Sequence, residues 1–236
     1  MTLLGVRLRQ RGLMWTRPGG RPMRFIAEQQ MDAGRVAFRW RARFGARLLR
    51  PFVVTDAYED GAGRLEGRLA GVRLFRSTGP DLARGQVMRY LAALAWLPDP
   101  RANPEVRWTD LGPDEAEVAA GCAGGRAAVR LRLGAGGDVL EAYAPDRPRS
   151  VDDGSVPTPW RGVFTDHGEL GGVRVPRRAE VSWELPEGRF TYWRAEVTAL
   201  EAEFDATGTF TVVRGYDPAH RLFRGRRTET YTQVTA

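Results

Sequence analysis

The chain has 236 residues, of which 42% are hydrophobic and seven are tryptophan, so it can bury a core and is not intrinsically disordered. The net charge is +7, and all 36 basic residues other than histidine are arginine. We attribute this use of arginine to a coding bias toward arginine, alanine and glycine rather than to a polyanionic partner. The single cysteine, Cys122, excludes an intrachain disulfide and any zinc or iron–sulfur site built from several cysteines.

An alternation of apolar and polar residues with period two dominates the chain and predicts about ten strands joined by glycine-rich turns. It is clearest over residues 36–44, where Phe38 and Trp40 point to one face of the strand and the arginines between them to the other. In chain order, the strands are predicted over Met23–Gln29, Val36–Phe44, Phe52–Tyr58, Arg64–Phe75, Glu105–Trp108, Glu115–Ala120, Ala128–Leu133, Glu180–Leu185, Phe190–Phe204 and Thr209–Tyr216.

One helix is predicted, over approximately residues 81–96, in the middle of the chain. Its apolar residues recur at spacings of three and four, Pro80 favours its start and Pro98 ends it. Strands with short connections around one central helix predict a mainly β (α+β) fold, a large curved antiparallel sheet or half-open barrel wrapped around the helix. A β-sandwich is the alternative.

The domain organisation is expected to be simple. Residues 1–216 are predicted to form a single β-rich domain, and residues 217–236 a C-terminal extension that adds an edge strand or frays. No apolar run is long enough for a signal peptide or a membrane span, which predicts a cytoplasmic location.

The two histidines, His167 and His220, do not indicate chemistry. They are far apart in the sequence, and Asp166 would point to the opposite strand face from its neighbour His167. No G-x-S-x-G motif or phosphate loop is present. We therefore predict no catalytic residue, no metal and no cofactor, and we expect a strand that enters at Trp160 to end at Asp166-His167 before a hairpin turn over Gly168–Gly172.

An arginine stripe on one strand face is the main charged feature. Recognition of single-stranded RNA needs aromatic residues on the same face, but Phe38 and Trp40 lie on the opposite one. We expect a solvated outer face offset by cross-strand glutamates such as Glu180, Glu184, Glu196 or Glu201. The stripe comprises Arg35, Arg39, Arg41, Arg43 and Arg47, with a smaller one at Arg130 and Arg132.

Six blocks of sequence together resemble an uncharacterised family of bacterial domains of unknown function. They are MRFIAEQ, FRWRARF, DAYEDGAGRLEGRLAGV, GPDLARGQVMRYLAALAWLP, TPWRGVFTDHGELGGVRVP and EVSWELPEGRFTYWRAEV, and the resemblance runs from about Val6 to Phe204. The family commonly has glutamate where this chain has Ala93, and tyrosine where it has His167. It also usually has residues before the first strand, so we expect that the N-terminus is trimmed or mis-started.

The resemblance implies no established activity. The β-rich pattern with one helix suggests a fold similar to the LolA/LolB lipoprotein carriers, which hold acyl chains between a curved sheet and its helix. By that analogy the concave face carries a pocket for a lipid or other small hydrophobic molecule, although an ordinary core is the alternative for its aromatic residues. The predicted pocket residues are Trp40, Asp56, Tyr58, Arg89, Tyr90, Trp96, Trp108, Trp160, Trp183 and Trp193, with Phe38 and Leu91 on the same side.

Three functions remain open. The first is non-enzymatic binding of a lipid or small hydrophobic ligand. The second is an enzyme with a site around Arg89 and Asp56, joined by Tyr90 and His167, against which Ala93 counts because the family's usual acid is missing there. The third is a binder of anionic surfaces through the arginine stripe. No specific nucleic acid and no membrane span are expected, and the oligomeric state is left undetermined.

Overall fold

A single antiparallel sheet contains most of the residues that this computed structural model describes, which are 2–45, 52–152 and 154–205. In this part of the chain the sheet has thirteen strands in the order β6-β5-β4-β3-β2-β1-β13-β12-β11-β10-β9-β8-β7. The strands are β1 (Leu3–Met14), β2 (Met23–Asp32), β3 (Phe38–Phe44), β4 (Phe52–Glu59), β5 (Ala62–Leu69), β6 (Val72–Ser77), β7 (Arg107–Gly112), β8 (Glu115–Cys122), β9 (Gly125–Leu133), β10 (Val139–Val151), β11 (Gly154–Leu170), β12 (Val173–Leu185) and β13 (Gly188–Phe204).

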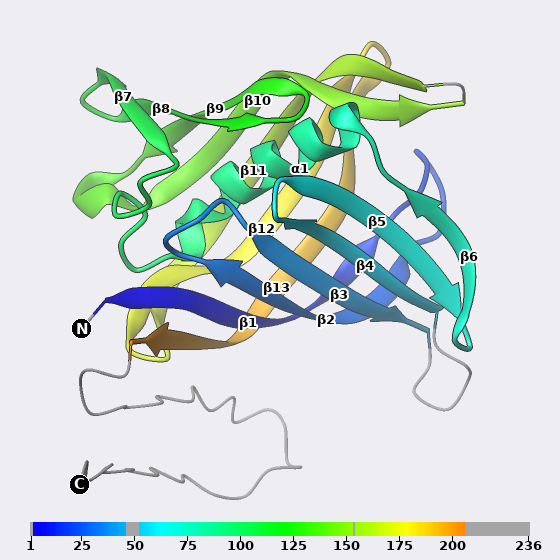
Figure 1. Ribbon diagram of the computed structural model, residues 1–236, viewed down its shortest axis with the longest axis horizontal. Coiled ribbons are helices and arrows are strands. Elements are labelled where there is room, and N and C mark those ends of the chain that lie inside the picture. Colours follow the sequence, from blue (N-terminus) through cyan, green and yellow to red (C-terminus); the bar gives the residue numbers. More distant parts are fainter. Residues whose placement is uncertain (1, 46–51, 153, 206–236) are drawn as a thin grey trace, which may run out of the picture.

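A helix, α1 (Pro80–Ala93), links the two edge strands of the sheet and crosses its concave side (Figure 1). A one-turn 3₁₀ helix (Leu94–Trp96) continues it. The helix contacts β4 and β5 on one side and β8, β9 and β10 on the other. The sheet therefore forms a half-open barrel around α1, with β6 and β7 as its edges.

The core lies between α1 and the concave face, and it follows from the period-two alternation. On β3 the aromatic side chains of Phe38 and Trp40 are buried, whereas the arginines between them are exposed. On α1, Val87 and Leu91 are fully covered. Burial of each such side chain contributes roughly 1.5–3 kcal/mol relative to exposure, so the helix is held mainly by its packing against the sheet.

Two glycines allow the helix to lie close to the sheet. A Cβ atom on Gly63 of β5 would lie only 2.8 Å from the Cα atom of Ala83 on α1. Gly124, before β9, meets the other side of the helix, where a Cβ atom would lie 3.0 Å from the Cβ of Arg84. Side chains at these two positions would push the helix away from the strands.

The predicted fold class is confirmed, and the helix predicted over residues 81–96 corresponds to α1 and its 3₁₀ turn. The single strand predicted over Arg64–Phe75 is wrong, because a tight turn divides it into β5 and β6. The two turn residues, Ala70 and Gly71, have φ values of 52° and 86°. Alanine rarely adopts a positive φ and is not a turn signal in a sequence. Gly71 alone therefore marked this turn, and one glycine was too weak a signal.

Strand β10 is absent from the predicted strands because it contains Pro145 and Pro148, and proline cannot donate a hydrogen bond to the ladder. The pairing with β11 shifts at this point, since Ala144 is opposite Trp160 but Arg147 is opposite Thr158. This β-bulge reverses the alternation of side chains, so that Arg147 points toward α1.

The predicted end of the next strand is also wrong, because β11 continues past Asp166-His167 to Leu170. His167 pairs with Pro176 in β12, and its Nε2 atom donates a hydrogen bond to the Val139 carbonyl at 3.0 Å. The turn is formed by residues 171–172 alone, both glycines with positive φ. The strand predicted over residues 209–216 and the domain boundary at 216 lie outside the described residues.

Candidate ligand-binding cavity

A cavity of about 560 Å³ lies between α1 and the concave face of the sheet. Its wall is formed by residues of α1, of β1 to β6 and of β10 to β13, so both halves of the curved sheet contribute to it (Figure 1). The volume lies within the range of roughly 300–1,000 Å³ that is typical of sites for small molecules.

Aromatic rings in mutual contact cover the wall on the β1–β6 side. The ring of Phe75 lies 6.4 Å from that of Phe52, which lies 5.8 Å from that of Phe44. Behind Phe44, the buried ring of Phe25 lies 6.1 Å from that of Trp193. Phe75 is 40% exposed and Trp193 only 7%, so the rings form a continuous apolar path from solvent to the interior.

The same wall contains one ion pair, between Arg89 of α1 and Asp56 of β4. The two carboxylate oxygens of Asp56 accept hydrogen bonds from Arg89 and from Gln86. The Arg89 guanidinium also lies 5.0 Å from the Trp40 ring, at cation–π distance. Both charges are therefore compensated inside the chain, and both oxygens of the carboxylate are occupied.

A second arginine, Arg147, lies on the β10–β13 side of the cavity. Its guanidinium is 4.7 Å from the Trp160 ring and 5.3 Å from the Trp183 ring. Its Nε donates to the Gly85 carbonyl at 3.1 Å and its Nη1 to the Tyr192 hydroxyl at 3.2 Å. Regular alternation along β10 would have placed Arg147 on the outer face. Pro145 was the one sequence signal of the β-bulge that turns Arg147 toward the cavity.

The structure brings seven of the ten predicted pocket residues to the cavity wall. A role for them in ligand binding stays a prediction. Tyr58, Tyr90 and Trp108 do not lie on this wall: Tyr58 is buried, and the Trp108 ring packs 4.4 Å from the Arg101 guanidinium. The seven are Trp40, Asp56, Arg89, Trp96, Trp160, Trp183 and Trp193.

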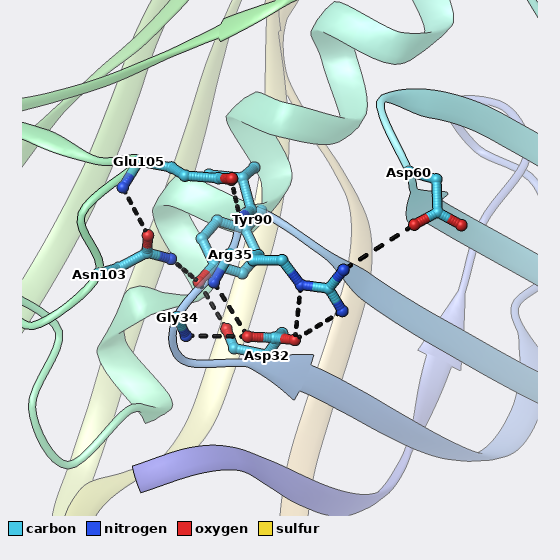
Figure 2. A network of polar contacts seen from close by, with 8 residues as sticks. Asp32, Gly34, Arg35, Asp60, Tyr90, Asn103 and Glu105 are labelled. Carbon is cyan, nitrogen blue, oxygen red and sulfur yellow. Dashed lines mark hydrogen bonds and ion pairs between the residues drawn. The ribbon is translucent and has the colours of Figure 1, made fainter. Parts of the chain in front are cut away.

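Tyr90 belongs instead to a polar network that ties α1 to the turn after β2 (Figure 2). Its hydroxyl donates to the Asp32 carbonyl at 2.7 Å and accepts from the Asn103 amide at 2.8 Å. The Asn103 side-chain oxygen accepts from the Glu105 backbone N–H at 2.9 Å. Burial raises the pKa of Tyr90 far above its ordinary value, so the phenol is neutral. Tyr90 thus holds α1 against the end of β2.

Asp166 and His167 have separate partners. Asp166 accepts a hydrogen bond from Arg177 at 2.7 Å, while the His167 ring is held by Val139. Within the described residues, no group of three or more histidine, cysteine, aspartate or glutamate side chains is arranged to hold a metal ion. In the same residues, no helix has both the length and the apolar character needed to cross a membrane.

The arginine stripe on β3 faces solvent, as expected, and the aromatic residues between its members are buried. The prediction that glutamates of β12 and β13 pair with this stripe is wrong, because β3 lies between β2 and β4. Arg39 pairs with Glu59 at 2.9 Å, and Arg35 with Asp32 at 3.2 Å. Three of the expected glutamates pair elsewhere, Glu180 with Arg194, Glu184 with Arg161 and Glu196 with Arg11. Arg47 lies outside the described residues.

Two solved structures resemble this one. The first is a domain from Vibrio parahaemolyticus assigned to outer membrane lipoprotein sorting, with 9% sequence identity, a TM-score of 0.50, and coverage of 86% of this chain and 87% of that one. The second is a LolA superfamily protein from Nitrosomonas europaea, with 11% identity, a TM-score of 0.45 and the same coverage. The former supports the LolA-like fold that the sequence suggested.

No curated protein matches this sequence. The model of one protein family matches residues 3–195, which is most of the chain and nearly all of the described sheet. The chain belongs to the family of unknown function DUF6544, and its fold is LolA-like.

Proposed function

We propose that this chain binds a lipid or another small hydrophobic molecule, without catalysis, in the cavity on the concave side of the sheet. The observation that carries the proposal is the 560 Å³ cavity whose wall is largely aromatic and aliphatic. Removing an apolar ligand from water against such a wall is favourable by roughly 25 cal/mol per Å² of buried surface. Phe75 on this wall is 40% exposed, so the apolar surface that would hold such a ligand extends to the solvent.

The two alternatives have less support. An enzyme around Arg89 and Asp56 would need a free base or anion clamp, but each of these groups is the other's partner and Gln86 occupies the second carboxylate oxygen. A binder of anionic surfaces through the arginine stripe would need uncompensated charge. Arg35 and Arg39 are paired with acids, which leaves only Arg41 and Arg43 of the described stripe residues for such binding. A cytoplasmic location stays a prediction, which cell fractionation would test.

A cavity-filling variant tests the proposal directly. Val54 of β4 lines the cavity, whereas Val53 precedes it on the opposite face of the same strand. We expect the neutral dye N-phenyl-1-naphthylamine to gain fluorescence with the unchanged protein and with Val53→Trp, but at least tenfold less with Val54→Trp. The thermal unfolding midpoints of both variants serve as the folding control.

Ligands that co-purify with the native protein provide the second measurement. Organic extraction followed by mass spectrometry is expected to recover hydrophobic molecules from the unchanged protein and from Val53→Trp, and to recover much less from Val54→Trp. Equal dye binding by the two folded variants, together with an extract that contains no hydrophobic molecule, would reject the proposed function.

A further inference from the structure

The guanidinium of Arg147 is held in one position before any ligand arrives. Its Nε is hydrogen-bonded to the Gly85 carbonyl, and its plane lies close to the rings of Trp160 and Trp183. The β-bulge in β10 fixes the backbone from which it projects. A charged group that is immobilised in this way loses little conformational entropy when it binds an anion.

The Tyr192 hydroxyl beside it has an unused hydrogen. Its oxygen accepts one hydrogen bond from Trp160 Nε1 at 3.0 Å and another from Arg147 Nη1 at 3.2 Å. A phenol oxygen offers two lone pairs and one O–H donor, so both acceptor positions are filled. No residue in the described ranges accepts the remaining hydrogen. Tyr192 and the free N–H groups of Arg147 therefore form a cluster of donors on the cavity wall.

The charge of Arg147 differs from that of Arg89 on the same wall, because it has no carboxylate partner among the described residues. Arg89 is paired with Asp56, and Asp81 accepts a hydrogen bond from Ser155. Arg147 forms no ion pair with any carboxylate in the part of the chain that the structure describes, and the neighbouring Arg149 donates only to the Thr158 hydroxyl among the same residues. Against the single carboxylate of Asp81, the two arginines of β10 leave a net positive charge beside the apolar wall.

We propose that Arg147 and Tyr192 bind the anionic head group, a carboxylate or a phosphate, of an amphipathic acyl ligand whose chain lies along the aromatic wall. This inference rests on the proposed function, because it names the chemical class of the ligand in the same cavity. The guanidinium matches the paired oxygens of either anion, and the Tyr192 O–H adds a third donor. The rings of Trp160 and Trp183 border this contact, and the low polarity beside them strengthens it.

The test compares ligands that share one chain and differ in head group. Palmitate carries a carboxylate, hexadecyl phosphate a phosphate, and 1-hexadecanol no charge. Each is used to displace N-phenyl-1-naphthylamine from the full-length protein, at concentrations below those at which it forms micelles. We expect at least tenfold tighter binding of one or both anions than of hexadecanol, and the stronger anion identifies the head group.

Variants of the full chain separate recognition from folding. Arg147→Gln and Tyr192→Phe are expected to weaken binding of the anions at least fivefold and to leave hexadecanol unchanged. Arg101→Gln is the matched control, because Arg101 also lies over a tryptophan, Trp108, but not on the cavity wall. It is expected to change none of the three affinities.

Each outcome decides a different point. Equal affinity of the unchanged protein for palmitate, hexadecyl phosphate and hexadecanol would overturn the head-group site and leave the proposed function intact. An equal loss of affinity for all three ligands in folded Arg147→Gln would also overturn the head-group site. Arg147 would then only hold α1 against β10. Failure of the unchanged protein to bind the dye or any of the three would reject the proposed function itself. The ligand comparison alone decides the question if either variant fails to fold.

Discussion

Arg89 and Arg147 line the same cavity, but they have different interaction partners. The Arg89 side chain is 23% exposed and is paired with Asp56, which is 13% exposed. Arg147 instead has aromatic rings, a carbonyl and a hydroxyl around it. The first arrangement stabilises the fold, and the second leaves donors free for a ligand.

The Arg89–Asp56 pair leads to a prediction about stability. Replacement Asp56→Leu leaves the Arg89 charge without its partner in a largely buried place, and we expect a loss of about 2 kcal/mol in the free energy of unfolding. The double variant Asp56→Leu, Arg89→Met is expected to recover most of this loss, since neither charge remains. Urea unfolding measures both. A double variant no more stable than the single one would show that the pair contributes through its shape and not its charge.

Sequence reasoning identified individual residues well where burial decided their place, and less well where a partner decided it. Trp40, Trp160 and Trp193 were expected on the concave side by analogy with the LolA/LolB fold, and they line the cavity. Tyr90 has the same apolar surroundings in the sequence, but its hydroxyl is bonded to Asp32 and Asn103. Those contacts depend on the packing of α1 against a distant turn, which no local pattern contains.

At the scale of single elements, α1 is positioned by backbone contacts with glycines as well as by its side chains. Gly63 on β5 leaves room for Ala83, and Gly85 within the helix accepts a hydrogen bond from Arg147 through its carbonyl. The helix is thereby attached to both halves of the sheet. Gly85 is not required for this contact, because any residue supplies the carbonyl and an added Cβ would lie no closer than 3.7 Å to a neighbouring atom.

We expect Gly63→Ala to lower the free energy of unfolding by about 1–3 kcal/mol, because the new methyl group would overlap the helix backbone at Ala83. Gly121→Ala on β8 is the matched control, since its added Cβ meets no atom within 4 Å. That change is expected to be neutral or slightly stabilising. Urea midpoints of the two variants compare them, and equal midpoints would contradict the close approach.

The sequence predicted those strands in which apolar and polar residues alternate with period two. The alternation on β2 and β3 gives both the strands and their buried faces. Two departures from that period were missed, the turn at Ala70 and the bulge after Pro145. The bulge matters more, because it alone brings Arg147 to the cavity.

For the whole molecule, the chain order explains the cavity. Strands β1 to β6 build one half of the sheet, α1 crosses the concave side, and β7 to β13 return to pair with β1. The cavity is thus assembled from residues as far apart as Met14 and Trp193. The sequence predicted the curved sheet and its helix, but strand order is a long-range property that it did not specify.

The ion pairs of the sheet predict how stability changes with pH. A hydrogen bond from Arg161 lowers the pKa of Glu184, and one from Arg174 lowers that of Asp138. Because these folded-state values lie below the unfolded ones of about 4, their contribution is complete above that pH and is lost as the pH falls through the folded values. Urea midpoints are expected to be constant from pH 7 to about pH 5 and then to fall. The fall is expected to be shallower in Arg161→Gln, and an identical profile would contradict the assignment.

The edge strand β6 has a consequence for the behaviour of concentrated solutions. In the described part of the chain β6 has a neighbour on one side only, and its Val72 and Leu74 side chains are 68% and 57% exposed. Such an edge is a template for pairing with another copy, and Arg73 and Arg76 on the same strand oppose this by mutual repulsion. Salt screens that repulsion, so polymerisation through this edge is expected to begin at lower protein concentration as the ionic strength rises.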